Sequence, residues 1–183
     1  MRKCFSISAL AALAVGLIVL PAQGQEKAVE LTAGVFGIQS TNFSDSDYSL
    51  LEVATGGGYF AAGFYLSPGM AIEPTISATH LSVSNGGGSA TTIAFGVALP
   101  YYFNRGWGRK GPYLAPRVVW TNYSATDLDS QSQFGLGVAL GTKVPLNDAA
   151  ALRLQASFDY GFEGDLQSST AFGASAGLSV FLK

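Results

Sequence analysis

The end of the chain, residues 170–183, alternates between apolar side chains and small or polar ones. The apolar positions are Phe172, Ala174, Ala176, Leu178, Val180 and Leu182, and between them stand Gly173, Ser175, Gly177 and Ser179. A period of two with one apolar face is typical of a β-strand that is wet on one side only. The glycine and serine face is too small to be the core face of an ordinary β-sandwich. The pattern therefore predicts the closing strand of a membrane barrel, with its apolar face toward lipid.

The composition points away from a helical or ordinary soluble domain. Of the 183 residues, 48% are hydrophobic, only 12% are charged and 23 are glycine, and no long apolar helix is visible beyond the start of the chain. Glycine is unfavourable within helices, and the charge content is low for a soluble domain. An all-β chain is therefore expected.

The first 24 residues have the composition of a secretory signal peptide. Arg2 and Lys3 precede an apolar run that ends at Leu20, and small residues follow at Ala22 and Gly24. This order predicts a signal peptide over 1–24, cleaved after Gly24, and a barrel domain over 25–183. A retained membrane anchor is the alternative interpretation.

Cleavage would leave a mature chain of 159 residues with 8 basic and 12 acidic side chains, and hence a formal charge of −4. It would also remove Cys4, the only cysteine. The exported chain then needs no disulfide framework.

Seven further segments show the strand pattern. They are residues 27–38, 51–66, 70–83, 91–103, 112–123, 133–144 and 150–162. About eight strands of roughly 11 residues each are long enough to cross a bilayer at a tilt. The sequence therefore predicts an eight-stranded antiparallel up-and-down transmembrane β-barrel.

The connections between these segments are of two kinds. Those at 67–69, 104–111 and 145–149 are short or basic, whereas those at 39–50, 84–90, 124–132 and 163–169 are mostly longer and polar. Short turns in the periplasm and longer loops outside are the expected asymmetry of such a barrel, and an even strand number leaves both chain ends in the periplasm.

Two of the predicted strands need a decision on side-chain direction. In 27–38 the alternation puts Val35 toward lipid and Phe36 toward the lumen. In 51–66 one register leaves Phe60 in the lumen, and the other exposes Glu52. A bulge at the glycines 56–58 could switch the register between the two halves, and the sequence leaves this open.

Recurring hairpins carry a resemblance to a known family. The stretches are Gly63 to Ile72, Leu146 to Leu154, the pair Pro112-Tyr113, and Gly177 to Val180. In their order and spacing they resemble the small outer-membrane β-barrel proteins of the OmpA-transmembrane, OmpX and Ail type. The resemblance implies insertion by the barrel-insertion machinery, which recognises a terminal aromatic residue. Here the matching lipid-facing position is Leu182, and Phe181 has the other parity.

Six charged side chains are expected inside the barrel, three acidic and three basic. They are Glu30, Glu73, Arg117, Lys143, Arg153 and Asp159. In a narrow barrel side chains fill the lumen, and buried charges are tolerated only when they are paired and hydrogen-bonded. We expect a structural network of ion pairs, with a narrow or gated ion path as the alternative.

One pair of residues raises the question of catalysis. His80 and Ser82 share the predicted lipid-facing side near the outer rim, where a base and a hydroxyl could meet a lipid acyl chain. The placement is similar to that in lipid A deacylase barrels, which add an acid on the next strand. The segment 91–103 has no Asp or Glu. No enzyme activity is therefore expected, and a lipid A hydrolase remains an alternative.

The predicted outer loops carry acidic residues. They are Asp45, Asp47, Asp127, Asp129, Glu163 and Asp165. They are interpreted as a solvated surface that could also bind lipopolysaccharide-bridging cations or an extracellular partner, since no calcium-loop spacing is present.

The basic turn with Arg105, Arg109 and Lys110 would lie at the periplasmic rim. Nucleic-acid binding is excluded for an acidic exported chain, and no cofactor or metal motif is visible.

Together these observations predict a monomeric barrel in the outer membrane of a Gram-negative bacterium. Its partners would be outer-membrane lipids and lipopolysaccharide, with the insertion machinery during biogenesis. The expected role is structural or in surface interaction, such as adhesion or envelope integrity, through the outer loops. A small pore is the second interpretation, because the fold alone does not define the function.

Overall fold

The computed structural model describes residues 29–44, 49–55, 58–82, 89–104, 110–125, 128–162, 164 and 167–182. The predicted signal peptide and Gly56-Gly57 lie outside these ranges. Within them, no helix is long and apolar enough to span a membrane.

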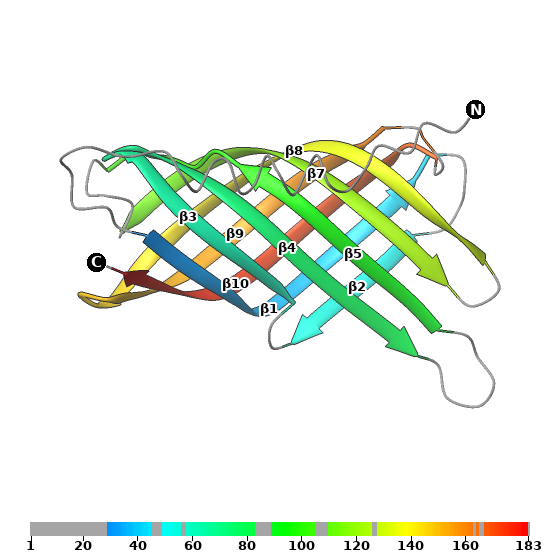
Figure 1. Ribbon diagram of the computed structural model, residues 1–183, viewed down its shortest axis with the longest axis horizontal. Coiled ribbons are helices and arrows are strands. Elements are labelled where there is room, and N and C mark those ends of the chain that lie inside the picture. Colours follow the sequence, from blue (N-terminus) through cyan, green and yellow to red (C-terminus); the bar gives the residue numbers. More distant parts are fainter. Residues whose placement is uncertain are drawn as a thin grey trace.

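The described chain is an antiparallel sheet that closes on itself (Figure 1). Its strands are β1 (Val29–Phe43), β2 (Ser49–Thr55), β3 (Tyr59–Ser67), β4 (Met70–Ser82), β5 (Ser89–Ala98), β6 (Tyr101–Tyr102), β7 (Gly111–Ala125), β8 (Leu128–Asn147), β9 (Ala150–Gly161) and β10 (Ser169–Leu182). Pairing between β1 and β10 closes the ring. Because β2 with β3, and β5 with β6, each form one crossing in two pieces, the ten strands make eight crossings. The predicted eight-stranded antiparallel barrel is confirmed.

The two ends of the barrel differ. At one end, called the turn end, tight turns at Pro68-Gly69 and Asp148-Ala149 join neighbouring strands, β1 begins and β10 ends. This end lies at the left in Figure 1. The Asn147 side chain accepts a hydrogen bond of 2.8 Å from the Ala149 backbone N–H, which stabilises the second turn. The opposite end is called the loop end.

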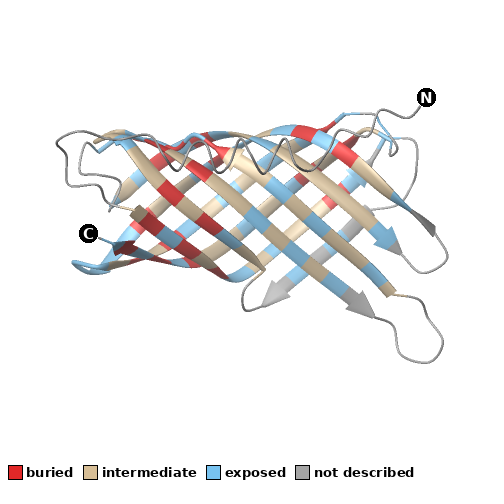
Figure 2. Cartoon of the chain, viewed as in Figure 1, coloured by how far each residue is buried: buried red, intermediate tan, exposed pale blue. Residues whose placement is uncertain are grey.

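Side chains alternate between the lumen and the outer surface, and Figure 2 shows the alternation as bands along the strands. Leu140 on β8 is 58% exposed and Phe172 on β10 is 57% exposed, whereas Glu30 and Ser179 are fully buried. The expected parity is confirmed for β4, β8, β9 and β10. Apolar side chains form the outer surface because lipid, and not a protein core, is their solvent.

The predicted direction of Phe36 is wrong, because β1 contains a bulge. Gly34 pairs with Gly177 but Phe36 pairs with Ala176, so Val35 is an extra residue in the ladder. Such an insertion reverses the parity beyond it. Val35 and Phe36 are both exposed on the outer surface.

The uncertain segment 51–66 changes parity between its halves. Odd residues of β2 face outward, with Val53 51% exposed, whereas even residues of β3 do so, with Phe60 57% exposed. Tyr59 and Tyr65 thus face the lumen. The register switch that the sequence allowed is the arrangement found, because it places Val53 and Phe60 both on the outer surface.

Two predicted loops are shorter in the structure. Strand β1 continues to Phe43 and β2 begins at Ser49, so most of 39–50 is hairpin. Strands β7 and β8 replace most of 124–132 and stay paired to Ala125 and Leu128. The Asn122 side chain donates a 2.8 Å hydrogen bond to the Ser130 hydroxyl across this hairpin. Strands can continue in this way beyond the bilayer. Their outer ends are polar on both faces, so the alternating apolar pattern that predicts a strand is absent there.

Candidate functional site

A buried ion pair joins opposite parts of the ring at the turn end. Glu30 comes from the start of β1 and Lys143 from the last turn-end stretch of β8, and Lys143 Nζ lies 2.5 Å from Glu30 Oε2. Both side chains are fully inaccessible. Tyr65 donates a 2.6 Å hydrogen bond to Glu30, and Lys143 donates one of 2.7 Å to the hydroxyl of Tyr102. The pair is therefore completed by hydrogen bonds, as a buried pair must be.

A second ion pair lies beside the first. Arg153 of β9 donates from Nη1 to Glu73 of β4 at 2.7 Å, and both side chains are only 3% exposed. Arg153 also donates to the hydroxyl of Tyr113 at 2.6 Å and to Gln155 at 2.8 Å. The guanidinium of Arg153 thus donates hydrogen bonds to three different side chains.

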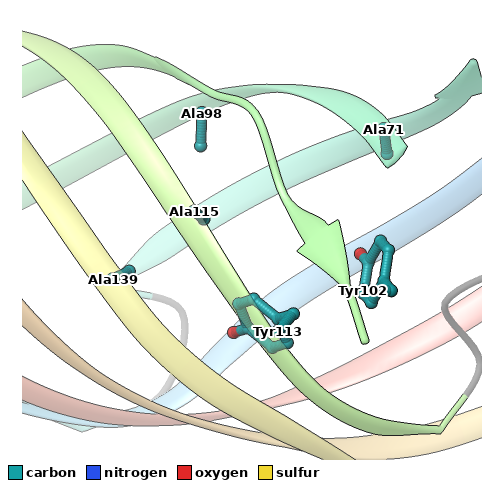
Figure 3. Close-up of a cluster of buried hydrophobic side chains, with 6 residues drawn as sticks. All are labelled: Ala71, Ala98, Tyr102, Tyr113, Ala115 and Ala139. Carbon is teal, nitrogen blue, oxygen red and sulfur yellow. The ribbon is translucent and has the colours of Figure 1, made fainter. Parts of the chain in front are cut away.

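Tyrosine rings fill the space around these charges. Tyr102 and Tyr113 form a buried cluster with four small residues, shown in Figure 3: Ala71, Ala98, Ala115 and Ala139. The two ring centroids are 5.6 Å apart, and Lys143 Nζ lies 4.5 Å from the centroid of Tyr102. Phe181 is also buried, with its centroid 5.8 Å from Lys143 Nζ.

We call these residues the turn-end plug. Its members are Glu30, Tyr65, Glu73, Tyr102, Tyr113, Lys143, Arg153 and Phe181. Sequence reasoning placed the charges in the lumen but missed the aromatic members. The signal was present for Tyr102, Tyr113 and Phe181, which have the inward parity of their predicted strands, whereas the open register of 51–66 left the direction of Tyr65 undecided.

The third ion pair lies nearer the middle of the barrel. Arg117 of β7 donates to the carboxylate of Asp159 on β9 through both Nε, at 2.7 Å, and Nη2. Gly137 of β8 is the register partner of both residues. Because Gly137 has no side chain, the long side chain of Arg117 can reach the carboxylate of Asp159 across the intervening strand. The side chains of Arg117 and Asp159 are 21% and 19% exposed, so this ion pair is more accessible to solvent than the two in the plug.

A polar cavity of about 240 Å³ lies in the lumen on the loop-end side of the plug. Its lining is rich in hydroxyl and amide side chains, among them Gln39, Thr41, Thr75, Ser77, Thr79 and Ser175. Its charged lining residues are Arg117, Asp159, Arg153 and Glu73, which are already paired with each other. The structure therefore brings the six predicted lumen charges together as three ion pairs, two of them in the turn-end plug and the third beside the cavity.

The other sequence candidates lie elsewhere. His80 is exposed on the outer surface, and its Nδ1 lies 2.9 Å from the hydroxyl of Thr91 on β5. The side chains of Ser82 and of Asp129, which is in β8 and not in a loop, lie outside the described part. Also outside it are Asp45, Asp47, Arg105, Arg109, Asp127, Glu163 and Asp165. Lys110 is exposed, and the described residues contain no group of three or more potential metal ligands.

A closed antiparallel ring with an apolar outside and a polar, largely filled inside defines a membrane β-barrel. Residues 10–180 match the family described as outer membrane protein beta-barrel domain. The chain belongs to this family, and the predicted family resemblance is thereby confirmed. No curated protein matches the sequence significantly.

Solved structures of similar fold come from several bacteria. Neisserial surface protein A has a TM-score of 0.61 at 16% identity, covering 85% of this chain and 97% of its own. OprG of Pseudomonas aeruginosa has a TM-score of 0.56 at 12% sequence identity, and the match covers 88% of this chain and 99% of OprG. Ail, the attachment invasion locus protein of Yersinia pestis, has a TM-score of 0.54 at 10% sequence identity, and the match covers 86% of this chain and 100% of Ail. At these identities the likeness establishes the fold alone.

Proposed function

We propose that this protein is a non-conducting outer-membrane barrel that acts at the cell surface, in adhesion or envelope integrity, through its loop end. The observation that carries the proposal is the turn-end plug. Two ion pairs with side chains at most 3% exposed, surrounded by three tyrosines, leave the lumen closed at one end. A barrel closed on one side has its outer surface and loops left for contact with other molecules.

The names of similar folds fit this role without establishing it. One is an attachment invasion locus protein and another a surface protein. A lipid A hydrolase has less support, because the described partner of His80 is Thr91 and the next strand has no carboxylate at this level. A surface role therefore accounts for more of the observed features than catalysis does.

The closed lumen predicts that the pure protein does not conduct ions. In a planar bilayer, the mature chain should give no stepwise current, because the plug leaves no continuous water path. A Tyr65→Ala/Tyr102→Ala variant lacks the two aromatic rings next to Lys143. This variant should show small, frequent current steps. Defined steps from the unaltered protein would contradict the proposal and favour the pore.

The direction of the barrel can be tested with single cysteines, since the natural Cys4 lies in the predicted signal peptide. A Gly164→Cys variant, exposed at the loop end, should react with a membrane-impermeant maleimide on intact cells. An Asp148→Cys variant, exposed in the β8–β9 turn, should react only after the cells are lysed. The reverse labelling pattern would place the loops in the periplasm and exclude a surface role for them.

A further inference from the structure

One lumen-facing amide at the loop end contacts both ends of the connection between β9 and β10. Gln133 of β8 is only 6% exposed, and its Nε2 donates hydrogen bonds to the carbonyl oxygens of Phe162, at 3.2 Å, and Gln167, at 2.7 Å. Its Oε1 accepts a hydrogen bond of 2.8 Å from the hydroxyl of Ser169, the first residue of β10. Because a carbonyl oxygen can only accept, these contacts use both donors of the amide and fix its orientation.

The wall leaves room for this amide. Gly161, the last residue of β9, is the register partner of Ser169. A Cβ atom on Gly161 would overlap the carboxamide of Gln133 and would lie 2.6 Å from the hydroxyl of Ser169. The Gln133 side chain therefore passes over the end of β9 and reaches β10, so three neighbouring strands meet at one buried hydrogen-bonding group.

A second set of contacts joins the β9–β10 connection to β1. Ser44 follows the last residue of β1, and Ser168 precedes the first residue of β10. The Ser44 backbone N–H donates a hydrogen bond of 2.9 Å to the Ser168 carbonyl oxygen. The Ser44 hydroxyl lies 2.8 Å from that oxygen and 2.6 Å from the Ser168 hydroxyl. These contacts extend the ring-closing β1–β10 ladder one position beyond its last pair, Phe43 with Ser169.

The two sets of contacts differ in their surroundings. The contacts of Ser44 are exposed, so water competes with them and they hold the rim only weakly by themselves. The amide of Gln133 is nearly buried, where leaving polar groups without partners is costly. Because Gln167 and Ser168 are adjacent in the chain, the bond from Gln133 to Gln167 also keeps Ser168 within reach of Ser44. A change at Gln133 on β8 should therefore be detectable at Ser44, beyond β9 and β10.

We propose that Gln133 positions the β9–β10 connection from inside the lumen, and that this connection and residues 43–44, the tip of β1, are thereby coupled across the ring-closing seam. Gln133 also lines the lumen cavity, so a group inside the barrel sets the conformation of a connection at its end. The coupling goes beyond the surface role proposed above and does not depend on it. A molecule that orders the connection would also restrict the tip of β1, because ordering one part of a coupled pair lowers the cost of ordering the other.

The hydrogen-exchange rate of the Ser44 backbone amide reports the coupling, and NMR of the mature protein in phosphatidylcholine nanodiscs measures this rate for single residues. A Gln133→Glu variant keeps the size of the side chain but, at neutral pH, lacks both donors. Its Ser44 amide should exchange about five- to thirtyfold faster, because the two hydrogen bonds that hold Phe162 and Gln167 are lost. A Gly161→Ala variant keeps the amide but displaces it, and should raise the Ser44 exchange rate as well.

A Gln39→Glu variant is the matched control, because Gln39 also lines the cavity but its amide donates to Thr41 on its own strand, at 3.3 Å. Its Ser44 amide should exchange like that of the unaltered protein, and the heat-dependent gel shift should show a folded barrel for each variant. An unchanged Ser44 rate in the Gln133→Glu variant, or an equal rise in the Gln39→Glu variant, would overturn the proposal.

A Ser44→Ala variant tests the coupling in the opposite direction and leaves the lumen unaltered. A nitroxide attached to a Gly164→Cys variant should become more mobile when Ser44→Ala is added, since the hydroxyl contacts to Ser168 are lost. Adding Ser130→Ala instead should leave the nitroxide spectrum unchanged, because the Ser130 hydroxyl bonds to Asn122 in the β7–β8 hairpin. Equal nitroxide mobility with and without Ser44→Ala would also overturn the proposal, whether or not the Gln133→Glu variant folds.

Discussion

Replacing Lys143 with methionine is expected to lower the free energy of unfolding by about 3–5 kcal/mol, because the change leaves Glu30 as an unpaired buried charge. The carboxylate of Glu30 is fully inaccessible and would retain only its hydrogen bonds from Tyr65 and Thr32. Urea-induced unfolding of the protein in lipid vesicles measures the change. A reversible transition is needed, and the gel shift reports the folded fraction independently.

Two further variants test whether the lost stability comes from the unpaired charge of Glu30. In a Glu30→Met/Lys143→Met variant both charges are absent, and most of the lost stability should return, since apolar replacement of a whole buried pair is often neutral. In a Lys110→Met variant an exposed lysine is removed, and the change should stay within about 0.5 kcal/mol. A loss below about 1 kcal/mol for Lys143→Met would show that water reaches Glu30 and that the plug is not closed.

Adding a single methyl group at Gly137 is expected to cost about 1–3 kcal/mol, since overpacking forces neighbouring atoms to move. A Cβ atom there would lie 2.7 Å from the Phe158 carbonyl oxygen and would overlap the carboxylate of Asp159. The backbone carbonyl belongs to the paired strand β9 and cannot move easily. The Gly137→Ala variant should therefore also loosen the ion pair between Arg117 and Asp159, which urea unfolding and the gel shift would detect.

Gly37 provides a matched control on another lumen-facing position. A Cβ atom there would have its nearest neighbours at 3.9 Å, an ordinary van der Waals distance. The Gly37→Ala variant should be neutral or more stable by up to about 1 kcal/mol, because alanine restricts the unfolded chain. Equal losses for both variants would indicate a general need for glycine in the lumen and not a specific crossing at Gly137.

Much of the fold was accessible from local pattern. The alternation in β4, β8, β9 and β10 predicted which side of each strand meets lipid, because a period of two allows only two orientations. A charged side chain facing lipid costs several kcal/mol, so Arg117 and Arg153 could be placed inward without a structure. Prediction failed at Val35, where one inserted residue reverses the parity of Phe36. A bulge of this kind has no reliable signal in composition.

The sequence by itself determined the class of protein, the number of crossings and the sign of the lumen charges, because these depend on each residue and its near neighbours. Only the tertiary structure decided that Glu30 pairs with Lys143, 113 positions away, and that Arg117 reaches Asp159 across Gly137. The physical reason is that ring closure and strand stagger, set by all the crossings together, determine which inward side chains meet.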